Sequence, residues 1–397
     1  MQRAEGASLR LLAGVAMVGV AAVLGFGALD SQAGQQGVPT PAAPAAPMPN
    51  PTPAYRGRLL VPAGLAVDDF ARVPGARFMA LGPDGSVYVS QTGSGNVVRL
   101  VDRDADGVAE RSEVVASGLH LPHGLAVHDG WLYIANTDEV VRLRLGAAGG
   151  PQGAPQATGA RYDAAGGHFT RTVVFGPDGA MYVSVGSTCN ICVEKDSTRA
   201  TVMRFDANGG HGRVFARGLR NAVGLAIHPP TGALWVSQHE RDNVLPRHED
   251  LPPEEINILR DGGDYGWPYC YGDRVPNPEF NDPARCARTL PPALAMQAHS
   301  APLGLAFLAT ASHLPADYRG DALVAFHGSW NRRQPTGAKV VRIRIRDGKP
   351  AAYEDFLSGF QGPDGRRWGR PVDVLVIQDG SVLVSDDDAG MIYRVHR

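Results

Sequence analysis

Two short polar segments flank one apolar unit of this chain, and both contain residue types that bind small molecules. Arg220 and Asn221 start a run whose residues 222–227 are apolar, and the polar segment 238–242, Gln-His-Glu-Arg-Asp, follows the run 233–237. A Pro-Pro-Thr-Gly turn joins the two runs, so we expect a β-hairpin. The two polar segments then lie at the same end of the hairpin, opposite its turn, and one rim collects the polar groups.

Arginines recur near the same predicted rim. Arg370 precedes a later apolar run, and Arg332 and Arg333 end the segment His-Gly-Ser-Trp-Asn-Arg-Arg. Converging guanidinium groups suit planar carboxylates or phosphates, which they bind through paired hydrogen bonds. A single arginine is equally well explained as a solvated charge or as the partner of a nearby aspartate. The recurrence of arginine at one structural position favours an anion-binding mouth.

His168 is the candidate for acid–base chemistry. It follows Gly166-Gly167 and comes just before another apolar run. The imidazole ring titrates near neutral pH, so at the mouth of a cleft it can accept a proton. A purely structural histidine is the alternative. His123 precedes the first run of another unit, and we group it with the polar residues of the mouth.

An acidic segment matches a metal-binding pattern. Residues 102–107, Asp-Arg-Asp-Ala-Asp-Gly, together with Glu113 fit the calcium-loop pattern D-x-D-x-D-G-x5-E. The flanking residues are typical of strands, so this would be the loop without the helices of an EF-hand, and an acidic turn is the alternative. We predict a structural calcium site, and its ligands are Asp102, Asp104, Asp106 and Glu113.

The elements that must position these groups form a repeat. Each copy has an apolar run, a turn, a second β-rich run and a third of the Val-Val-Arg-Leu type. The turn glycines Gly85, Gly130, Gly179 and Gly232 are spaced by 45, 49 and 53 residues. Periods of this size are typical of β-propellers, whereas a β-sandwich would not repeat one pattern. Six copies predict an all-β, six-bladed β-propeller, in which the first strand of each unit lines the central channel.

Composition and cysteines restrict the function further. Gly 49 and Pro 31 among 397 residues favour many turns and short strands. A formal net charge of −2 gives no basic surplus, which argues against a nucleic-acid partner. Four cysteines fit an oxidising compartment. The local pairs Cys189–Cys192 and Cys270–Cys286 are the simplest expectation, and a four-thiolate metal site is the rival.

The N-terminal region reads as export signal and spacer. In residues 1–33, Arg3 and Arg10 precede the apolar run 11–29, and Ser-Gln-Ala resembles a cleavage site. The run is long enough that an uncleaved membrane anchor is the alternative. Residues 34–57 are rich in Pro and Ala and predict a disordered spacer. The propeller, residues 58–397, is then periplasmic or secreted, or anchored to the inner membrane if the signal is kept.

Several ordered motifs resemble one family. They are H-F-x-R-x-V-V-F-G-P-D-G-x-M-Y-V-S-x-G at 168–186, G-L-R-N-x-x-G-L-A at 218–226, E-R-D…L-P-P-E-E-I-N at 240–257, D-G-G-D-Y-G-W-P at 261–268 and F-H-G-S-W-N-R at 326–332. In these motifs the chain resembles the glucose/sorbosone dehydrogenase family. These are secreted sugar dehydrogenases that use pyrroloquinoline quinone (PQQ), built on a six-bladed propeller.

The resemblance implies that PQQ lies flat across the channel mouth. His168 then acts as the general base, taking a proton from the anomeric hydroxyl of an aldose or sugar aldehyde while hydride passes to the quinone. Electrons go on to a periplasmic acceptor. A calcium ion polarises the quinone, held partly by the backbone carbonyls of Glu240 and Arg241. The residues grouped as cofactor contacts are Arg220, Asn221, Arg370, Arg332 or Asn331, and His123.

Three positions depart from the glucose-oxidising members. Ser187 replaces an aspartate that supports the base. Val223 replaces a polar residue that contacts the cofactor, and Val372 replaces a second arginine. These changes point to the sorbosone- or pyranose-oxidising side of the family. The acidic loop and the Cys-x-x-Cys segment are expected to lie outside the active residues. Two other functions stay open: a calcium-dependent propeller lactonase, and a non-catalytic propeller that binds carbohydrate or protein.

Overall fold

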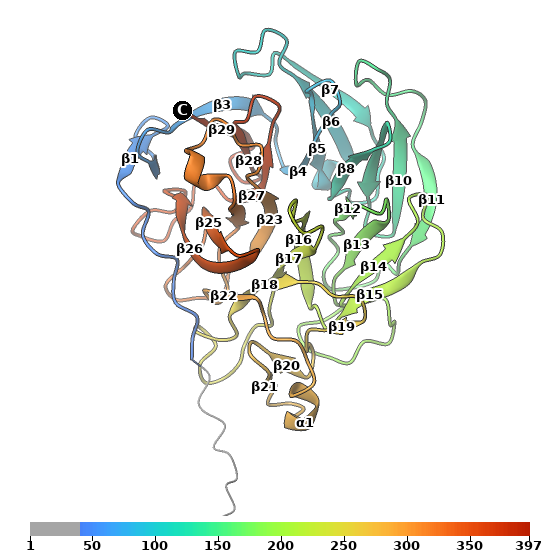
Figure 1. Ribbon diagram of the computed structural model, residues 1–397, viewed down its shortest axis with the longest axis vertical. Helices are drawn as coiled ribbons and strands as arrows, with labels where there is room; N and C mark the ends of the chain where they lie inside the picture. Colours follow the sequence, from blue (N-terminus) through green and yellow to red (C-terminus); the bar gives the residue numbers. More distant parts are fainter. Residues whose placement is uncertain (1–39) are drawn as a thin grey trace, which may run out of the picture. The chain divides into compact units, whose positions relative to one another are not determined.

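The computed structural model describes residues 40–397, which form six antiparallel sheets arranged around a common centre (Figure 1). The predicted all-β, six-bladed propeller is confirmed. The signal or anchor predicted for residues 1–33 lies outside the described residues. Within residues 40–397, no helix is long and apolar enough to cross a membrane.

The first three sheets follow one another along the chain, each running from an inner to an outer strand. The third also gains the parallel edge strand β19 (Gly263–Asp264). Their strands are β4 (Ala76–Leu81), β5 (Val87–Gln91), β6 (Asn96–Val101) and β7 (Arg111–Ala116); β8 (Leu125–His128), β9 (Trp131–Ala135), β10 (Glu139–Arg144) and β11 (Gln156–Arg161); β12 (Val173–Phe175), β13 (Met181–Val185), β14 (Thr201–Phe205) and β15 (Arg213–Arg217).

The fourth and fifth sheets have the same order, although long insertions interrupt them. Their strands are β16 (Asn221–Ile227), β17 (Leu234–His239), β18 (Glu254–Ile258) and β22 (Leu294–Met296); β23 (Pro302–Phe307), β24 (Ala322–Phe326), β25 (Lys339–Arg346) and β26 (Lys349–Leu357). The insertion before β22 also carries β20 (Cys270–Tyr271), β21 (Val275–Pro276) and the short helix α1 (Pro283–Cys286). Two 3-10 turns complete the described elements, at Thr92–Ser94 and Ala316–Tyr318.

The sixth sheet closes the ring. It contains β27 (Pro371–Val376), β28 (Val382–Asp386), β29 (Met391–His396) and β3 (Ala66–Arg72). The last strand of the chain, β29, pairs with β3 from the start of the propeller. The innermost strands contact one another in the order β4, β8, β12, β16, β23, β27 and back to β4. The ring therefore has no free sheet edge at its seam.

Buried serines join neighbouring sheets next to the inner strands. Ser237 Oγ accepts a hydrogen bond from Gly224 N (2.9 Å) in its own sheet and donates to Leu303 O (2.5 Å) in the next sheet. Two other serines make equivalent bonds. Ser90 Oγ accepts from Phe78 N (3.0 Å) and donates to His123 O (2.6 Å). Ser385 Oγ accepts from Asp373 N (3.0 Å) and donates to Arg77 O (2.6 Å). These three serines are completely buried. Because buried polar groups need partners, these bonds fix three of the six inner strands against the preceding blade.

The described part of the Pro/Ala tract is not a free spacer, so that prediction was wrong. Ala46 N donates to Tyr353 O (3.1 Å) and Asp355 N donates to Ala46 O (2.9 Å), which places the tract along β26. Further on, β1 (Pro51–Ala54) pairs with β2 (Leu59–Pro62). Proline removes only its own backbone donor, so the alanines between prolines can still pair with the exposed edge of a blade.

Both predicted disulfides are confirmed. Cys189 is bonded to Cys192 and Cys270 to Cys286, and the described residues include no free cysteine. The four-thiolate metal site is therefore excluded.

We expect Ser385→Ala to lower the free energy of unfolding by about 1–3 kcal/mol, because the buried Asp373 N–H loses its acceptor. Urea unfolding followed by circular dichroism measures this change. Ser94→Ala, at an exposed serine, is the matched control and should change stability by less than about 0.5 kcal/mol. Equal losses in the two variants would contradict the joining role of Ser385.

Candidate active site

A pocket at one mouth of the ring gathers ionisable side chains from the third, fourth and fifth sheets. Its volume is about 110 Å³, and it is lined by His168, Arg220, His239, Glu240, Asp242, Glu254, His299, Ala301 and Trp330. Asn221 pairs with His239 across the hairpin of β16 and β17. The predicted hairpin is therefore confirmed, and both of its polar ends reach the same pocket. A larger hollow of about 610 Å³ contains no histidine and does not offer this acid–base chemistry.

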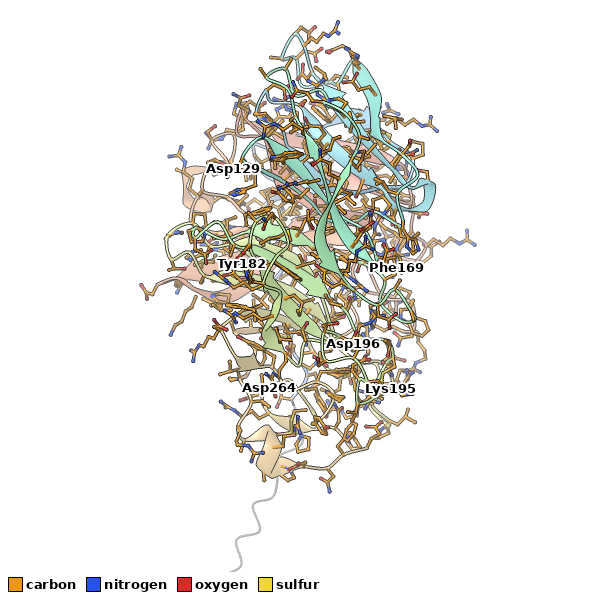
Figure 2. The ribbon with its side chains drawn as sticks, turned by 90° about the vertical axis from the view of Figure 1, so that its right-hand side faces the viewer. Asp129, Phe169, Tyr182, Lys195, Asp196 and Asp264 are labelled. Atoms are coloured by element: carbon orange, nitrogen blue, oxygen red, sulfur yellow. A yellow bond between two sulfur atoms is a disulfide. The ribbon has the colours of Figure 1, made fainter. Side chains whose placement is uncertain are left out.

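The mouth and the hairpin turns lie at opposite ends of the sheets. In the edge-on view, Phe169 and Asp196 come from loops on one side, and Asp129, in the turn between β8 and β9, lies on the other side (Figure 2). Phe169 follows His168 and is 41% exposed, so this side of the molecule is open next to the imidazole.

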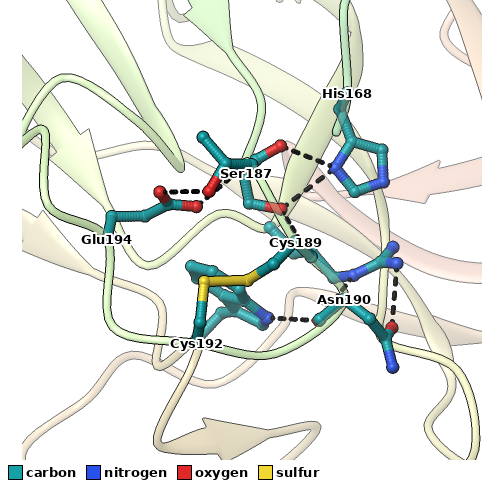
Figure 3. The surroundings of a disulfide bond; sticks show 9 residues. His168, Ser187, Cys189, Asn190, Cys192 and Glu194 are labelled. Atoms are coloured by element: carbon teal, nitrogen blue, oxygen red, sulfur yellow. Dashed lines mark hydrogen bonds between the residues drawn. A yellow bond between two sulfur atoms is a disulfide. The ribbon is translucent and has the colours of Figure 1, made fainter. Parts of the chain in front are cut away.

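Ser187 fixes the orientation of the His168 ring (Figure 3). His168 Nδ1 lies 3.0 Å from Ser187 Oγ and 3.1 Å from Ser187 O. Ser187 Oγ uses its own hydrogen to donate to Cys189 O (2.7 Å), so it must accept from the imidazole. The proton therefore sits on Nδ1, and the lone pair of the ring lies on Nε2. Serine thus does at this position what the family's aspartate was expected to do.

The imidazoles of His168 and His239 are neutral near neutral pH. Burial, together with the positive charge of Arg220, lowers the pKa of His168 to about 3. Burial also lowers the pKa of His239 to about 3, and the proximity of His168 and Arg220 adds to this effect. An anion bound beside Arg220 would offset its charge and raise the pKa of His168, which would make the ring a stronger base.

Arg220 is held mainly by uncharged oxygens. Its Nε donates to Asn190 O and its Nη2 to Asn190 Oδ1 (3.0 Å each), and Nη1 donates to Glu240 O (2.8 Å). Among the described residues, only Asp242 gives it a carboxylate partner, at 3.5 Å. Burial lowers the pKa of Arg220, whereas Asp242 acts in the opposite direction.

A second group of polar side chains borders the mouth. Arg370 Nε donates to His327 O (3.1 Å), and His327 Nε2 lies 2.9 Å from Asp387 Oδ1. Asp387 also accepts from Arg77 (2.7 Å), which lies 3.2 Å from His123 Nε2. Burial raises the pKa of Asp387, but His327 and Arg77 outweigh it and hold the pKa at about 2. His327 also lowers the pKa of His239, so this group borders the pocket.

Several guanidinium groups around the site have only uncharged partners. Arg370 donates to the carbonyls of His327 and Gly328, and Arg171 to those of His168 and Thr170. Burial lowers the pKa of Arg370, and it lowers the pKa of Arg171 to about 10. In residues 40–397 neither arginine forms a salt bridge. A buried charge without a counter-ion is costly, so this mouth favours an anionic ligand.

The other predicted cofactor residues are placed differently. Asn331 Nδ2 donates to Asp242 Oδ1 (2.9 Å), so it belongs to the site. Arg332 donates instead to backbone oxygens, which are those of Glu249, Ala298 and Gln334. His123 is completely buried, with its ring 4.2 Å from that of Phe78. Neither Arg332 nor His123 lines the pocket.

The apolar departures Val223 and Val372 lie together. With Phe78 and Leu303 they form one buried cluster, and the four residues come from the inner strands β16, β27, β4 and β23. Apolar side chains therefore fill the centre of the ring where polar cofactor contacts were expected in glucose-oxidising members.

One of the two predicted calcium ligands near the mouth, the carbonyl of Glu240, is already engaged. Glu240 O accepts from Arg220 Nη1 at 2.8 Å, which places a cationic donor on this carbonyl. The side chain of Arg241 donates to Asn277 (3.1 Å) and Glu279 (2.6 Å). Calcium at this carbonyl would require Arg220 to take another acceptor.

In the acidic loop, the fourth carboxylate differs from the prediction. The side chains of Asp102, Asp104, Asp106 and Glu110 bring carboxylate oxygens within 4.8 Å of one another. Glu113 was predicted wrongly: it lies on β7 and accepts from Arg99 (2.8 Å). The pattern assumes a helix after the loop, whereas here a strand follows and turns Glu113 towards β6.

Other residues of the site were missed from the sequence. His239 and Asp242 lie in the polar segment 238–242, but nothing in their spacing assigned them a role. His299, 3.4 Å from Asp242, and the exposed Trp330 come from segments without a pattern. The Cys-x-x-Cys segment was expected outside the active residues, but its Asn190 contacts Arg220. The sequence signal that could have placed Asn190 at the site is that its segment directly follows a predicted strand that ends at the mouth.

Comparison with known proteins gives the family of this chain. The TrAA12-like family profile matches residues 63–397. The pyrroloquinoline quinone-dependent pyranose dehydrogenase of Coprinopsis cinerea is 27% identical over 392 residues, which cover 81% of this chain and 52% of that protein. An uncharacterised protein of Borreliella burgdorferi is 32% identical over 220 residues, 54% of this chain and 57% of that protein. The chain spans about half the length of the curated relatives it matches.

One solved structure extends the similarity to the fold. The holo form of the pyranose dehydrogenase PQQ domain from Coprinopsis cinerea has a TM-score of 0.72 and 25% sequence identity, covering 90% of this chain and 100% of that chain.

We expect His168→Gln to change how stability depends on pH. The folded-state pKa of about 3 lies below the ordinary value of 6.5, so unfolding takes up a proton as the pH falls below about 6.5. The contribution of neutral His168 is complete above that pH and is lost towards pH 3, whereas Gln does not titrate. When the pH is lowered from 7 to 4.5, the free energy of unfolding of wild type, measured with urea, should fall by about 2–3 kcal/mol more than that of the variant. Parallel pH curves would contradict the shifted pKa.

Proposed function

The chain belongs to the TrAA12-like family, and we propose that it oxidises a pyranose or another aldose sugar with PQQ as the hydride acceptor. The observation that carries the proposal is a neutral His168, with its Nε2 lone pair free, in one pocket with buried Arg220. The names of the Coprinopsis cinerea proteins support both the cofactor and the class of sugar. The two disulfides support a location outside the cytoplasm, where an electron acceptor would reoxidise the cofactor.

The residues of the mouth fit the chemistry of PQQ, which carries carboxylates at its edge and carbonyls on its quinone. Arg220 is a buried cation and Arg370 a partly buried one, and both have few or no carboxylate partners for their guanidinium groups among the described residues. The buried oxygens Asn221 Oδ1 and Asn331 Oδ1 have no hydrogen-bond partner, so they are free to accept from a ring N–H or a sugar hydroxyl. These four residues would hold the cofactor.

The size of the pocket restricts where such a cofactor fits. Its volume of about 110 Å³ is below the roughly 300–1,000 Å³ of ordinary ligand pockets. A tricyclic quinone would therefore extend into the open mouth beside Trp330, which is 76% exposed. Calcium at the Glu240 carbonyl fits less directly because Arg220 occupies that carbonyl, so we assign it no step.

His168 would act as the base on the sugar. When bound, PQQ supplies the quinone that accepts hydride. Nε2 of His168 takes the proton of the anomeric hydroxyl, because its Nδ1–H is committed to Ser187. Burial and, to a smaller extent, the charge of Arg220 lower the pKa of His168, so the ring is neutral and can accept this proton. Once the ring is protonated, the negative charge of Asp242 stabilises it, since Asp242 raises the pKa of His168.

We also propose that the acidic loop holds a structural calcium ion at Asp102, Asp104, Asp106 and Glu110. Asp102 Oδ1 is buried without a hydrogen-bond partner, which suits a metal ligand. Isothermal titration should detect calcium binding that Asp104→Asn weakens by about tenfold or more. Equal calcium uptake by wild type and variant would contradict the assignment.

Reconstitution tests the proposed reaction. The apoprotein is mixed with PQQ and calcium, and reduction of an electron-accepting dye is followed with a panel of aldoses. We expect turnover with a pyranose or related aldose. Lactone hydrolysis without dye reduction would favour the propeller lactonase instead. Binding of PQQ without turnover would favour a non-catalytic binding propeller.

His168→Ala tests the base. It should lower kcat by about 10²–10⁴-fold while leaving PQQ binding within a few-fold, because the base acts on the sugar. His211→Ala, at an exposed turn histidine, is the matched control and should keep full turnover. Retained turnover in His168→Ala would remove His168 as the base.

A further inference from the structure

The loop closed by the Cys189–Cys192 disulfide lies against the proposed site and contributes Asn190 to it (Figure 3). The cysteines are three positions apart, so only Asn190 and Ile191 lie between them. Beside the disulfide, Thr188 donates to Glu194 through its backbone N (2.6 Å) and its Oγ1 (2.8 Å). One covalent bond and two polar bonds therefore hold this loop in place.

Asn190 uses every polar atom of its side chain on two residues of the pocket. Its Oδ1 accepts from Arg220 Nη2 (3.0 Å) and from Asp242 N (2.8 Å), and its Nδ2 donates to Asp242 O (3.1 Å). Its backbone oxygen accepts from Arg220 Nε (3.0 Å) and Trp267 Nε1 (3.2 Å). No other residue in the described part of the chain bonds both Arg220 and the backbone of Asp242 in this way.

This arrangement keeps a cation and an anion from pairing closely. Asn190 offers Arg220 two oxygens at 3.0 Å, whereas the Asp242 carboxylate stays at 3.5 Å. Asp242 in turn accepts from Asn331 at 2.9 Å. A closer Arg220–Asp242 pair would neutralise the guanidinium that the mouth presents to an anionic ligand. The neutral amide of Asn190 holds Arg220 without cancelling its charge.

The same loop also reaches the base. Cys189 O accepts from Ser187 Oγ (2.7 Å), and Ser187 Oγ accepts from His168 Nδ1 (3.0 Å). The carbonyl of Cys189 therefore connects the disulfide to His168 through Ser187, and the neighbouring Asn190 connects it to Arg220.

We infer that Asn190 is a positioning residue of the sugar-oxidising site, and that the Cys189–Cys192 disulfide holds it there. It aligns Arg220 for the carboxylates of the cofactor, and it supplies the shorter hydrogen bonds to Arg220, while Asp242 stays at 3.5 Å. The role of Asn190 in cofactor binding rests on the proposed function. Its role in placing Arg220 does not. Without the disulfide the loop gains conformational entropy. Forming its hydrogen bonds to Arg220 then costs more free energy, because that entropy is lost when the loop becomes ordered.

The test compares four variants with wild type: Asn190→Ala, the double variant Cys189→Ser/Cys192→Ser, the triple variant that combines them, and Asn208→Ala as a matched control at an exposed turn asparagine. The affinity for PQQ is measured by equilibrium titration, without turnover. The KM for sugar, kcat and the thermal midpoint are measured separately. Crystal structures of the apoprotein variants report the position of the Arg220 guanidinium.

We expect Asn190→Ala and the double cysteine variant each to raise the Kd for PQQ by about tenfold, with the KM for sugar within a factor of about two. The Kd of the triple variant for PQQ should exceed that of Asn190→Ala or of the double cysteine variant by no more than about twofold, because the disulfide acts through Asn190. Arg220 should move towards Asp242 in the variant crystals, and Asn208→Ala should match wild type.

Two results separate this inference from the proposed function. If wild type binds PQQ and oxidises sugar, but Asn190→Ala leaves both the Kd and the position of Arg220 unchanged, the positioning role is refuted and the function stands. If wild type fails to bind PQQ while Arg220 still moves in Asn190→Ala, the positioning role stands and the proposed reaction falls. A loss of thermal stability with unchanged Arg220 and Kd also refutes the positioning role.

Discussion

Buried positive charge at one mouth of the ring is the constraint on which the rest of this structure depends. Arg171 and Arg370 are held by carbonyl oxygens, and Arg220 has a carboxylate only at 3.5 Å. Such charges are costly to bury, and neutral oxygens stabilise them only in part. An acidic, flat ligand would complete the arrangement. Burial, together with the charge of Arg220, keeps His168 neutral, and a bound anion would make the ring a stronger base. One electrostatic feature therefore links the binding of a cofactor to the readiness of the base.

The fold supplies the rigidity that this charge requires. The inner strands contact one another in a closed ring, and buried serines such as Ser90 and Ser385 fix three of these strands to the preceding blade. Two of those serines bond the backbone oxygens of His123 and Arg77, so the joints of the scaffold lie directly beneath the mouth. The disulfide loop extends this rigidity above the strands, where no sheet hydrogen bonds are available. Scaffold and site are thus held by the same kind of bond, a buried polar group with a fixed partner.

Much of the fold followed from the sequence because its signals are local. The period of the turn glycines predicted the blades, and the hairpin from 221 to 239 predicted which polar groups share a rim. The structure brings His168 and Arg220 together in one pocket with Asn331 bonded to its Asp242, and the local spacing of the cysteines predicted both disulfides. The failures depend on contacts between distant segments. Asn190 bonds Arg220 across 30 positions, and the Pro/Ala tract pairs with β26 about 300 positions away. Glu110 replaced Glu113 because the strand after the acidic loop, not the spacing of the motif, decides which carboxylate turns inward.

The most direct measurement is the crystal structure of this protein grown with PQQ. The account predicts a flat ligand at the mouth, within hydrogen-bonding distance of Arg220, with His168 Nε2 facing the open space where a sugar would sit. A ligand bound instead in the 610 Å³ hollow, or anywhere that leaves Arg220 and His168 without contact to it, would contradict the idea that the buried arginines exist to hold an acidic cofactor.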